Sequence, residues 1–428
     1  MELVLALILF VGCYILMMLE VFNRAFIAII GGLLMVIVGV APFGELIKQA
    51  IDWDTILLLL AMMIIVTITA QTGVFEYMAL LLAKKVGARP IFILIVICFL
   101  TAIGSAFLDN VTTVLLLVPV VLRLTQTLEL PEQPFLISVI LFSNIGGTAT
   151  LIGDPPNLMI GQAVAHLDFN AFLLHMTPIV IIDFFVVMVF IIVLYGRKLR
   201  PDPHLEGRLK QLNPYERLKK GPVLTRSLLV LALTITTFVL HSVIHVNMAT
   251  TALAGAFLLL LLTYQSISLS DVFRKVDWET LLFFAGLFML VGALVHIGLI
   301  DRAAVALLDM TNGDIPRTAL IILWGSGLFS GFVDNIPFVA TMIPVIKEMG
   351  NIGITNLDPL WWALALGSCL GGNATLIGAS ANVIVAGFSK ETDHPLTFFS
   401  FLKIGFPVVI LSLVVSTLYL WFRYLIHF

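Results

Sequence analysis

Charged residues are scarce in this sequence. Of its 428 residues, only 11% are Asp, Glu, Lys or Arg, whereas 60% are hydrophobic. A soluble globular protein has roughly 25% charged residues, so this composition excludes a soluble enzyme. The apolar runs are long enough to supply about ten to twelve spans of roughly 20 residues each. The composition therefore predicts an all-α polytopic membrane protein, with the lipid bilayer as its surroundings.

Cysteine is equally rare, and the net charge is small. The three cysteines lie in apolar stretches without the spacing of a disulfide framework or a zinc site, so no metal site is predicted. A net charge of −3 offers no basic surface for nucleic acid. No basic segment precedes the first apolar run, and we interpret residues 3–19 as a retained span. Without a Gly-rich phosphate loop, we expect no cofactor and no ATP hydrolysis by this chain, and a soluble ATPase partner stays open.

The sequence contains one unit twice, with corresponding positions 225 residues apart. Asp52-Trp53-Asp54-Thr55 recurs as Asp277-Trp278-Glu279-Thr280, and residues 143–157 match residues 368–382 with nine identities in fifteen and no gap. Repetition at a fixed offset indicates a duplicated structural unit. We predict a first repeat over residues 1–196, a basic linker over 197–226 and a second repeat over 227–428.

Each repeat contains two segments that differ from simple spans. An Asp-Asn pair interrupts the first segment, which we predict to be a re-entrant hairpin over 90–124 and, in the second repeat, over 316–349. Residues 111–124 are too few to cross about 30 Å of hydrocarbon. Gly pairs and prolines interrupt the second segment, a broken helix over 135–165 and 360–387. Five full spans per repeat then remain, and an odd number inverts the second repeat relative to the first.

The distribution of basic residues indicates the orientation in the membrane. If the linker 197–226 is cytoplasmic, 18 of the 23 Lys and Arg residues fall on the cytoplasmic side. Such a bias is what the positive-inside rule predicts for a correct topology. We therefore expect a multi-pass protein of the plasma membrane with both termini outside.

Polar residues at the hairpins and breaks form the predicted ion site. An aspartate within a span costs roughly 2.5 to 3.5 kcal/mol on insertion scales. No Lys or Arg lies within a predicted span, so a proton, a bound cation or a helix N-terminus must balance the charge. Broken helices expose carbonyl and N–H groups that bind ions. The predicted binding residues are Asp109, Asn110, Asn144, Gly146, Gly147, Thr148, Thr150, Asp154, Asn157, Asp334, Asn335, Gly371, Gly372, Asn373, Thr375, Ser380 and Asn382.

Two aspartates form the predicted proton path. Asp154 is the leading coupling carboxylate, because the corresponding residue of the second repeat is Ala379. Its structural alternative is an N-cap for the half-helix that begins at Pro155. Asp183 lies well inside the last span of the first repeat, and its alternative is a hydrogen bond to a Ser or Thr of a neighbouring helix. For the hairpin aspartates, the alternative is a protonated side chain hydrogen-bonded to a neighbouring helix.

These motifs resemble the ion transporter superfamily, which contains arsenite permeases, D-type sodium/proton antiporters, P-protein-like transporters and, more distantly, divalent-anion/sodium symporters. The resemblance rests on residues 105–113, 144–157, 333–338 and 369–382. It implies a scaffold domain and a mobile transport domain with two opposed hairpins and two broken helices. Such proteins are commonly homodimers that carry substrate by an elevator-like displacement.

The resemblance leads to the hypothesis that the chain expels arsenite or antimonite, a small inorganic substrate, in exchange for protons. Sodium/proton antiport is the alternative, with H⁺ or Na⁺ as the coupling ion. Sodium-coupled dicarboxylate transport ranks lower, because adding negative charge beside the Asp-Asn tips is unfavourable. A passive channel and an intramembrane aspartyl protease also rank below the two main hypotheses. Duplicated polar motifs suit transport and not proteolysis, which argues against the protease.

Overall fold

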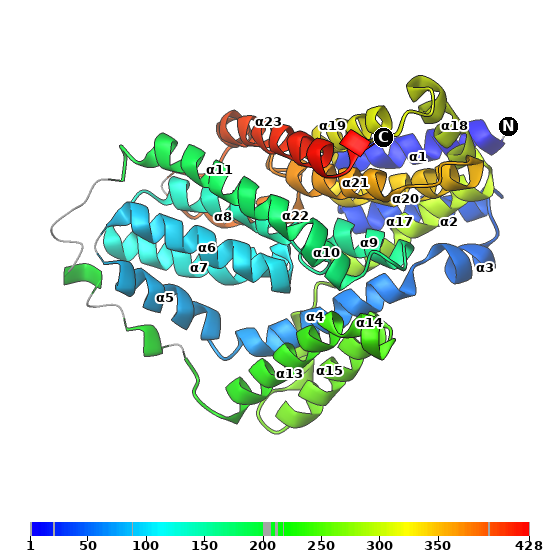
Figure 1. The fold of residues 1–428 in the computed structure, drawn as a ribbon. Coiled ribbons are helices and arrows are strands. Elements are labelled where there is room, and N and C mark those ends of the chain that lie inside the picture. Colours follow the sequence, from blue (N-terminus) through cyan, green and yellow to red (C-terminus); the bar gives the residue numbers. More distant parts are fainter. Residues whose placement is uncertain are drawn as a thin grey trace.

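The computed structural model describes residues 2–19, 22–87, 89–199, 207–209, 213–216, 218–392 and 394–427. Within these ranges the chain is helical and contains no strand, as the composition predicts. Eight of the helices found there combine the length and apolar composition needed to cross a membrane. Figure 1 shows these helices in one elongated assembly. The chain is therefore an all-α, multi-pass membrane protein.

The duplication is visible helix by helix. The first repeat contains α1 (Glu2–Met18), α2 (Arg24–Ile37), α3 (Phe43–Glu45), η1 (Leu46–Ala50), α4 (Trp53–Ala70), α5 (Val74–Val86), α6 (Pro90–Leu108), α7 (Asn110–Leu128), α8 (Glu132–Gly147), α9 (Pro155–Ala163), α10 (Phe169–His175) and α11 (Thr177–Tyr195). The second contains α13 (Pro222–Val239), α14 (His241–Ile244), α15 (Met248–Thr263), α16 (Leu269–Arg274), α17 (Trp278–His296), α18 (Leu299–Thr311), α19 (Ile315–Val333), α20 (Asn335–Ile352), α21 (Asp358–Gly371), α22 (Ser380–Ser389) and α23 (Phe398–Arg423). Helices α4, α5, α6, α7 and α9 each begin 225 residues before their counterparts.

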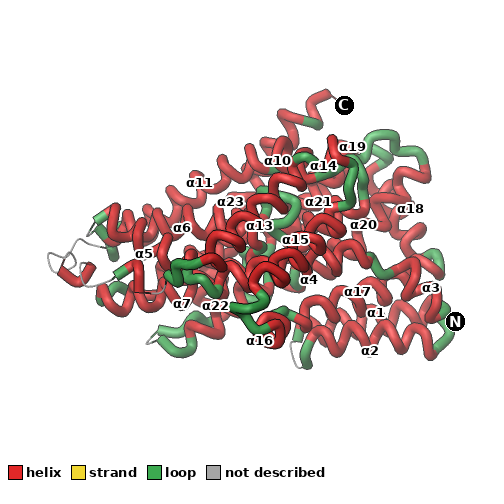
Figure 2. Tube along the Cα trace, turned by 90° about the horizontal axis from the view of Figure 1, so that it is seen from below, coloured by secondary structure: helices red, strands yellow, loops and turns green. Residues whose placement is uncertain are grey.

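Helices of one repeat pack against helices of the other repeat in reciprocal pairs. Helix α2 packs along α17, and its counterpart α15 packs along α4. Figure 2 shows α1, α2 and α17 side by side, and we call these helices with α4, α13 and α15 the scaffold. The second group, α6 to α9, α11 and α19 to α23, is joined in the same reciprocal way, because α7 contacts α22 and α20 contacts α9. Both repeats therefore contribute to the centre of this second group.

The repeated Asp-Trp-Asp/Glu-Thr motif starts two equivalent scaffold helices, α4 and α17. Asp52 Oδ1 accepts a hydrogen bond from the backbone N of Thr55 at 3.2 Å, and Asp277 Oδ1 accepts from that of Thr280 at 3.0 Å. Side-chain acceptors at this position satisfy N–H groups that have no partner within the helix. The motif that reveals the repeat is thus an N-cap for α4 and for α17.

Each hairpin turns on a single aspartate. Asp109 joins α6 to α7 with a φ of 72°, and Asp334 joins α19 to α20 with a φ of 76°. Positive φ is uncommon for residues other than glycine, and Asp tolerates it because its short side chain bonds nearby backbone groups. Asp109 Oδ1 accepts from Thr112 N at 2.7 Å, and Asp334 Oδ1 accepts from Ile336 N at 3.2 Å. In Figure 1 the α6–α7 pair and the α19–α20 pair reach the centre from opposite ends of the molecule.

The prediction that residues 111–124 are too short to span is wrong. Helix α7 continues to Leu128 and has 19 residues, because Pro119 does not end it. The hairpin is therefore defined by the chain reversal at Asp109 and not by a short second arm. The observed hairpins cover 90–128 and 315–352, a few residues beyond the predicted 90–124 and 316–349.

The broken helices follow the predicted pattern and cover 132–163 and 358–389, compared with the predicted 135–165 and 360–387. Helix α8 ends at Gly147 and α9 begins at Pro155, while α21 ends at Gly371 and α22 begins at Ser380. Gly146 is needed because a Cβ there would overlap the backbone of Ala102 on α6. Glycine thus lets α8 and α6 touch through their backbones.

Two helices and the end of the linker differ from the predictions. Helices α5 and α18 have only 13 residues each and carry charged residues, so they escape a search for long apolar runs. The linker ends at 221 instead of 226, because Pro222 starts α13. Its described part lies against the ends of α5 and α7, where Arg123 pairs with Glu216 at 2.9 Å. The remaining linker positions lie outside the described residues.

Candidate functional site

Four of the predicted asparagines meet at the centre of the second helix group. The Nδ2 atom of Asn144 on α8 donates to Oδ1 of Asn373 and to Oδ1 of Asn382, each at 2.9 Å. Its Oδ1 accepts from Nδ2 of Asn110 at 3.2 Å. All four side chains are buried. Asn144 therefore connects the first hairpin tip to the break of the second repeat's broken helix and to the half-helix α22 that follows it.

Replacing Asn144 with Ala is expected to lower the thermal stability of the purified protein by several degrees. The change removes partners from three buried amides, and one unsatisfied buried polar group costs about 1–3 kcal/mol. Thermal unfolding in detergent measures the effect. The control is Asn351→Ala, because Asn351 is exposed and its side-chain amide donates to the nearby Glu348 at 2.8 Å. Equal melting temperatures for the two variants would contradict a structural role for Asn144.

Asn157, and Asn382 of the network described above, bridge the breaks in the helices. Asn157 Nδ2 donates to the carbonyl oxygens of Thr148 at 3.2 Å and Thr150 at 3.0 Å. Its counterpart Asn382 donates to those of Gly372 at 2.7 Å and Thr375 at 2.8 Å. The threonine side chains also bond inward: Thr150 Oγ1 donates to Ala106 O, Thr375 Oγ1 to Gly331 O, and Thr148 Oγ1 to Asn144 O. These hydrogen bonds, together with Gly147, hold each break in one conformation. Because they occupy carbonyl oxygens of the breaks, fewer carbonyl groups are free to bind an ion than the sequence implies.

Asp154 lies where the two repeats meet. Its side chain is 1% exposed, and Nδ2 of Asn335 at the second hairpin tip lies 3.2 and 3.3 Å from its two carboxylate oxygens. Although Asp154 occupies the N-cap position of α9, its side chain makes no capping hydrogen bond. The structural alternative of a helix cap is therefore wrong. None of the ion pairs formed by the described residues includes Asp154, so an amide is its neutral partner across the repeats.

Asp334 has a cationic partner that the sequence analysis missed. Nη1 of Arg24 lies 2.7 Å from Oδ2 of Asp334, and Ser380 Oγ donates to the same oxygen at 3.3 Å. The expectation that no Lys or Arg neutralises a site carboxylate is wrong. Arg24 is the first residue of α2, just outside the span predicted from the apolar pattern, and the hairpin tip lies level with this end of α2. The sequence feature that points to Arg24 is its position as a single arginine at the boundary of a span.

Among the described residues, no ion pair corresponds to this one at the first hairpin tip. Ala249 occupies the position equivalent to Arg24. Both carboxylate oxygens of Asp109 instead accept from Thr112, Oδ1 from the backbone N and Oδ2 from Oγ1, each at 2.7 Å. The two tips therefore differ in charge although their backbones match.

A buried thiol also belongs to this centre. Cys369 is fully buried on α21, and its Sγ lies 3.4 Å from Oδ1 of Asn157. It is not among the predicted site residues, because a single cysteine in an apolar helix is usually a packing residue. Its position beside a glycine pair, aligned with Asn144, was the available signal.

Asp183 lies apart from this network. It is fully buried on α11, and Oδ2 accepts a hydrogen bond from Ser412 Oγ on α23 at 3.0 Å. The neighbouring Phe184 ring contacts Phe142 of α8, with the centroids 4.9 Å apart. Asp183 therefore sits one helix layer behind the asparagine network, and its place in a proton path stays a prediction.

Two cavities lead to the hairpin tips from the same side. One of about 400 Å³ is lined by Arg24, Asp334 and Asp277, and another of about 560 Å³ is lined by Thr112, Asp277 and the linker residue Lys219. Because Asp277 belongs to both and Lys219 belongs to the linker, both tips are reached from the linker side of the molecule. The site thus opens toward the linker.

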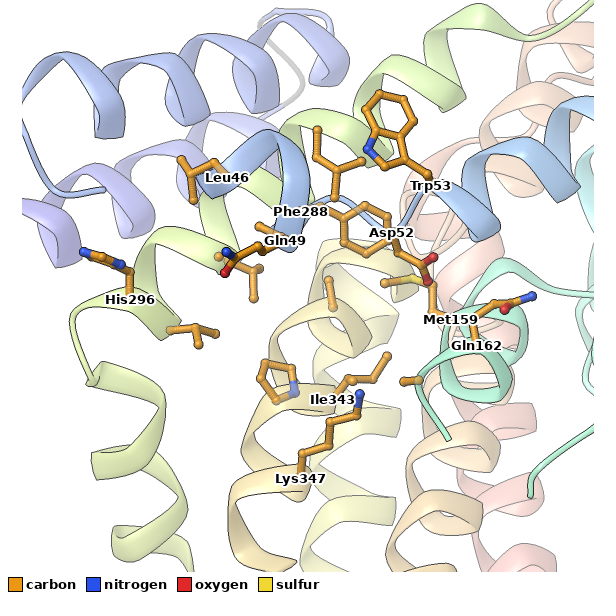
Figure 3. Close-up of a pocket in the computed structure, with 18 of the residues that line it drawn as sticks. Leu46, Gln49, Asp52, Trp53, Met159, Gln162, Phe288, His296, Ile343 and Lys347 are labelled. Carbon is orange, nitrogen blue, oxygen red and sulfur yellow. The ribbon is translucent and has the colours of Figure 1, made fainter. Parts of the chain in front are cut away.

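A third cavity lies on the opposite side and reaches neither tip. It has a volume of about 760 Å³ between η1, the start of α4, α17, α20 and α9, and Figure 3 shows Lys347 extending from α20 into it. Asp52, Gln162 and His296 also line it, but none of the predicted site residues does. Its wall residues Phe288, Gly292, Val295 and His296 correspond to Met63, Thr67, Ala70 and Gln71 of the linker-side cavity. The two cavities are therefore counterparts produced by the duplication.

The comparisons with known proteins agree with this architecture. A family model described as a citrate transporter matches residues 14–367. The chain belongs to this citrate transporter family. An uncharacterized transporter of Mycobacterium bovis and a 46 kDa membrane protein of Mycobacterium leprae are each 39% identical to it over 428 residues, and each comparison covers 99% of both chains.

Human P protein is 34% identical to this chain, over 96% of this chain and 58% of the P protein, which confirms the resemblance to P-protein-like transporters. Two solved structures share the fold. The YdaH transporter of Alcanivorax borkumensis, described as having an unusual topology, gives a TM-score of 0.57 at 15% identity and covers 91% of this chain and 88% of its own. MtrF of Neisseria gonorrhoeae gives 0.56 at 12% identity, covering 98% and 94%.

Proposed function

We propose that this membrane transporter expels arsenite or antimonite across the plasma membrane in exchange for protons. The buried Asp154 carboxylate, held by Asn335 across the repeats, carries this proposal. An unpaired carboxylate inside a membrane protein requires a proton or a cation to balance its charge, and it can release that charge when the surroundings change. The side chains of Asn110, Asn144, Asn373 and Asn382 at the centre are neutral amides, which suit a neutral hydroxide such as arsenous acid.

The direction of opening supports loading from the linker side. Both hairpin tips are reached through cavities that share Asp277 and include the linker residue Lys219. If the linker is cytoplasmic, as the basic residues indicate, this structure is an inward-facing state with both termini outside. An exporter collects its substrate in that state.

Carboxylate transport is a second candidate, and a specific observation favours it. Arg24 neutralises Asp334, which weakens the electrostatic objection to an anionic substrate. The description of the family names citrate, which adds weight to this candidate. Sodium/proton antiport remains the alternative in which Asp154 binds Na⁺ and H⁺ in turn.

Purified protein in lipid vesicles distinguishes these functions. Internal pH is followed with a dye while arsenite, sodium or citrate is added outside in separate experiments. A pH change driven by arsenite supports the proposal, whereas a change driven by sodium alone supports antiport. Citrate uptake without any response to arsenite would replace the proposal with carboxylate transport.

The variant Arg24→Gln distinguishes transport of an anionic substrate from transport of a neutral one. If Arg24 binds a substrate carboxylate, we expect the KM for citrate to rise at least about tenfold, because a charged hydrogen bond contributes about 1.5–3 kcal/mol. If the substrate is neutral arsenous acid, its KM should change much less. Arg302→Gln on the exposed face of α18 is the matched control. A large rise in the KM for arsenite with none for citrate would contradict this assignment.

A further inference from the structure

The contact between α11 and α23 contains two buried polar atoms without partners. Oδ1 of Asp183 and Oγ of Ser416 have no hydrogen-bond partner, and both residues are fully buried. A buried serine in a helix usually bonds a backbone carbonyl of the preceding turn, as Ser138 does with Pro134 O at 2.7 Å. Two such atoms in one helix contact require a physical explanation.

The helices place these atoms close to one another. Ser412 Oγ donates to Oδ2 of Asp183, and Ser416 lies four residues further along α23, on the same helix face. Beyond that point Ile179 of α11 and Tyr419 of α23 line one groove, so the two helices run antiparallel here. Ser416 therefore lies one helical turn beyond Ser412, toward the level of Ile179, on the face of α23 that holds the contact with Asp183.

The fold does not require polar residues at these positions. The residues that correspond to Asp183, Ser412 and Ser416 in the other repeat are Val408, Val187 and Ile191. The same architecture is thus built with apolar side chains in the counterpart positions. The polar group is an addition specific to one side of this contact.

Charge indicates which kind of ligand these atoms would bind. None of the ion pairs among the described residues includes Asp183. No hydrogen bond joins Ser416 to Asp183, so a proton on Asp183 would neutralise the carboxylate and leave Ser416 unpartnered, whereas a water molecule would leave the charge unbalanced. We propose that Asp183, Ser412 and Ser416 form a binding site for a sodium ion between α11 and α23.

This site is linked to the central network through α8. Phe184 contacts Phe142, and the adjacent Leu141 carbonyl accepts from Asn373 Nδ2 at 3.2 Å. Sodium at Asp183 would therefore stabilise the helix layer on which Asn144 and Asn373 are mounted. The site does not depend on which substrate the centre carries.

Thermal unfolding of the purified full-length protein tests this site, with sodium chloride and choline chloride compared at equal concentration. A ligand that binds only the folded state raises the melting temperature. We expect sodium to raise it in the wild type but not in Asp183→Asn. In Ser416→Ala, half-saturation should require about tenfold more sodium, the effect of losing roughly one ligand contact.

Two control variants show whether the sodium-dependent rise in melting temperature arises at Asp183. Ser138→Ala removes a buried hydroxyl elsewhere and should keep the full response to sodium. Asp154→Asn should also keep it, because the central carboxylate lies outside the site. Loss of the response in Asp154→Asn with retention in Asp183→Asn would place sodium at the centre and overturn the inference. A wild type that responds to pH but not to sodium would overturn it as well, in favour of a proton.

Discussion

Asp154→Asn is expected to abolish substrate-driven proton movement in a protein that still folds. The amide has the size of the carboxyl group and can keep the contact with Asn335, but it cannot bind and release a proton. Removing a positioned proton-transfer group typically lowers a rate by about 10²- to 10⁴-fold, so we expect at least a hundredfold loss. The internal pH of vesicles containing the variant measures this loss.

The matched control for this experiment is Asp301→Asn. Asp301 lies on the exposed face of α18, so the same chemical change there should leave proton movement close to that of the wild type. A melting temperature near the wild-type value would show that the Asp154 variant is folded. Normal proton movement in a folded Asp154→Asn variant would contradict the role of Asp154 in proton coupling, on which the proposed function rests.

Gly146→Ala is expected to prevent stable folding of the second helix group. The added Cβ would overlap the carbonyl oxygen, Cα and carbonyl carbon of Ala102, and these backbone atoms cannot rotate away. Overpacking a well-packed contact costs about 1–3 kcal/mol, and occasionally more, and backbone overlap belongs at the upper end. The yield of monodisperse protein and its melting temperature both report the loss.

Gly325→Ala is the control for that substitution. Gly325 lies on the exposed face of α19, and a Cβ there would meet no atom within 4 Å. Because both glycines are helical, the two variants share the gain in helix propensity and differ only in contact. Equal stability of the two variants would mean that α6 and α8 can separate without loss.

Much of the central site could be predicted because it follows from local sequence repeated at a fixed offset. The Asp-Asn pairs mark the hairpin tips, and the glycine pairs mark the breaks. Such features depend on backbone chemistry within a few residues. The pairing of Asn144 with Asn373 and Asn382 also follows once two similar broken helices are placed face to face.

Other features depend on how distant helices are positioned, which local patterns do not encode. Arg24 reaches Asp334 only because the hairpin tip lies level with the start of α2. Asp109 looked equivalent to Asp334, yet Thr112 occupies both of its carboxylate oxygens. In the same way, hydrogen bonds within the breaks use Thr150 and Asn157, which the sequence analysis treated as free ligands.

The two cavities related by the duplication have different chemical walls. A blocker that fills the cavity of Figure 3 would meet Glu45, Asp52, Asp54 and Lys347, whereas the counterpart cavity presents Glu76, Asp277, Lys219 and Lys275. Shared architecture with unlike charges means that an inhibitor selected against one mouth would have little affinity for the other. The duplication has thus produced a transporter whose two cavities are separate pharmacological targets. Inhibition should therefore depend on the side of the membrane from which a compound is applied.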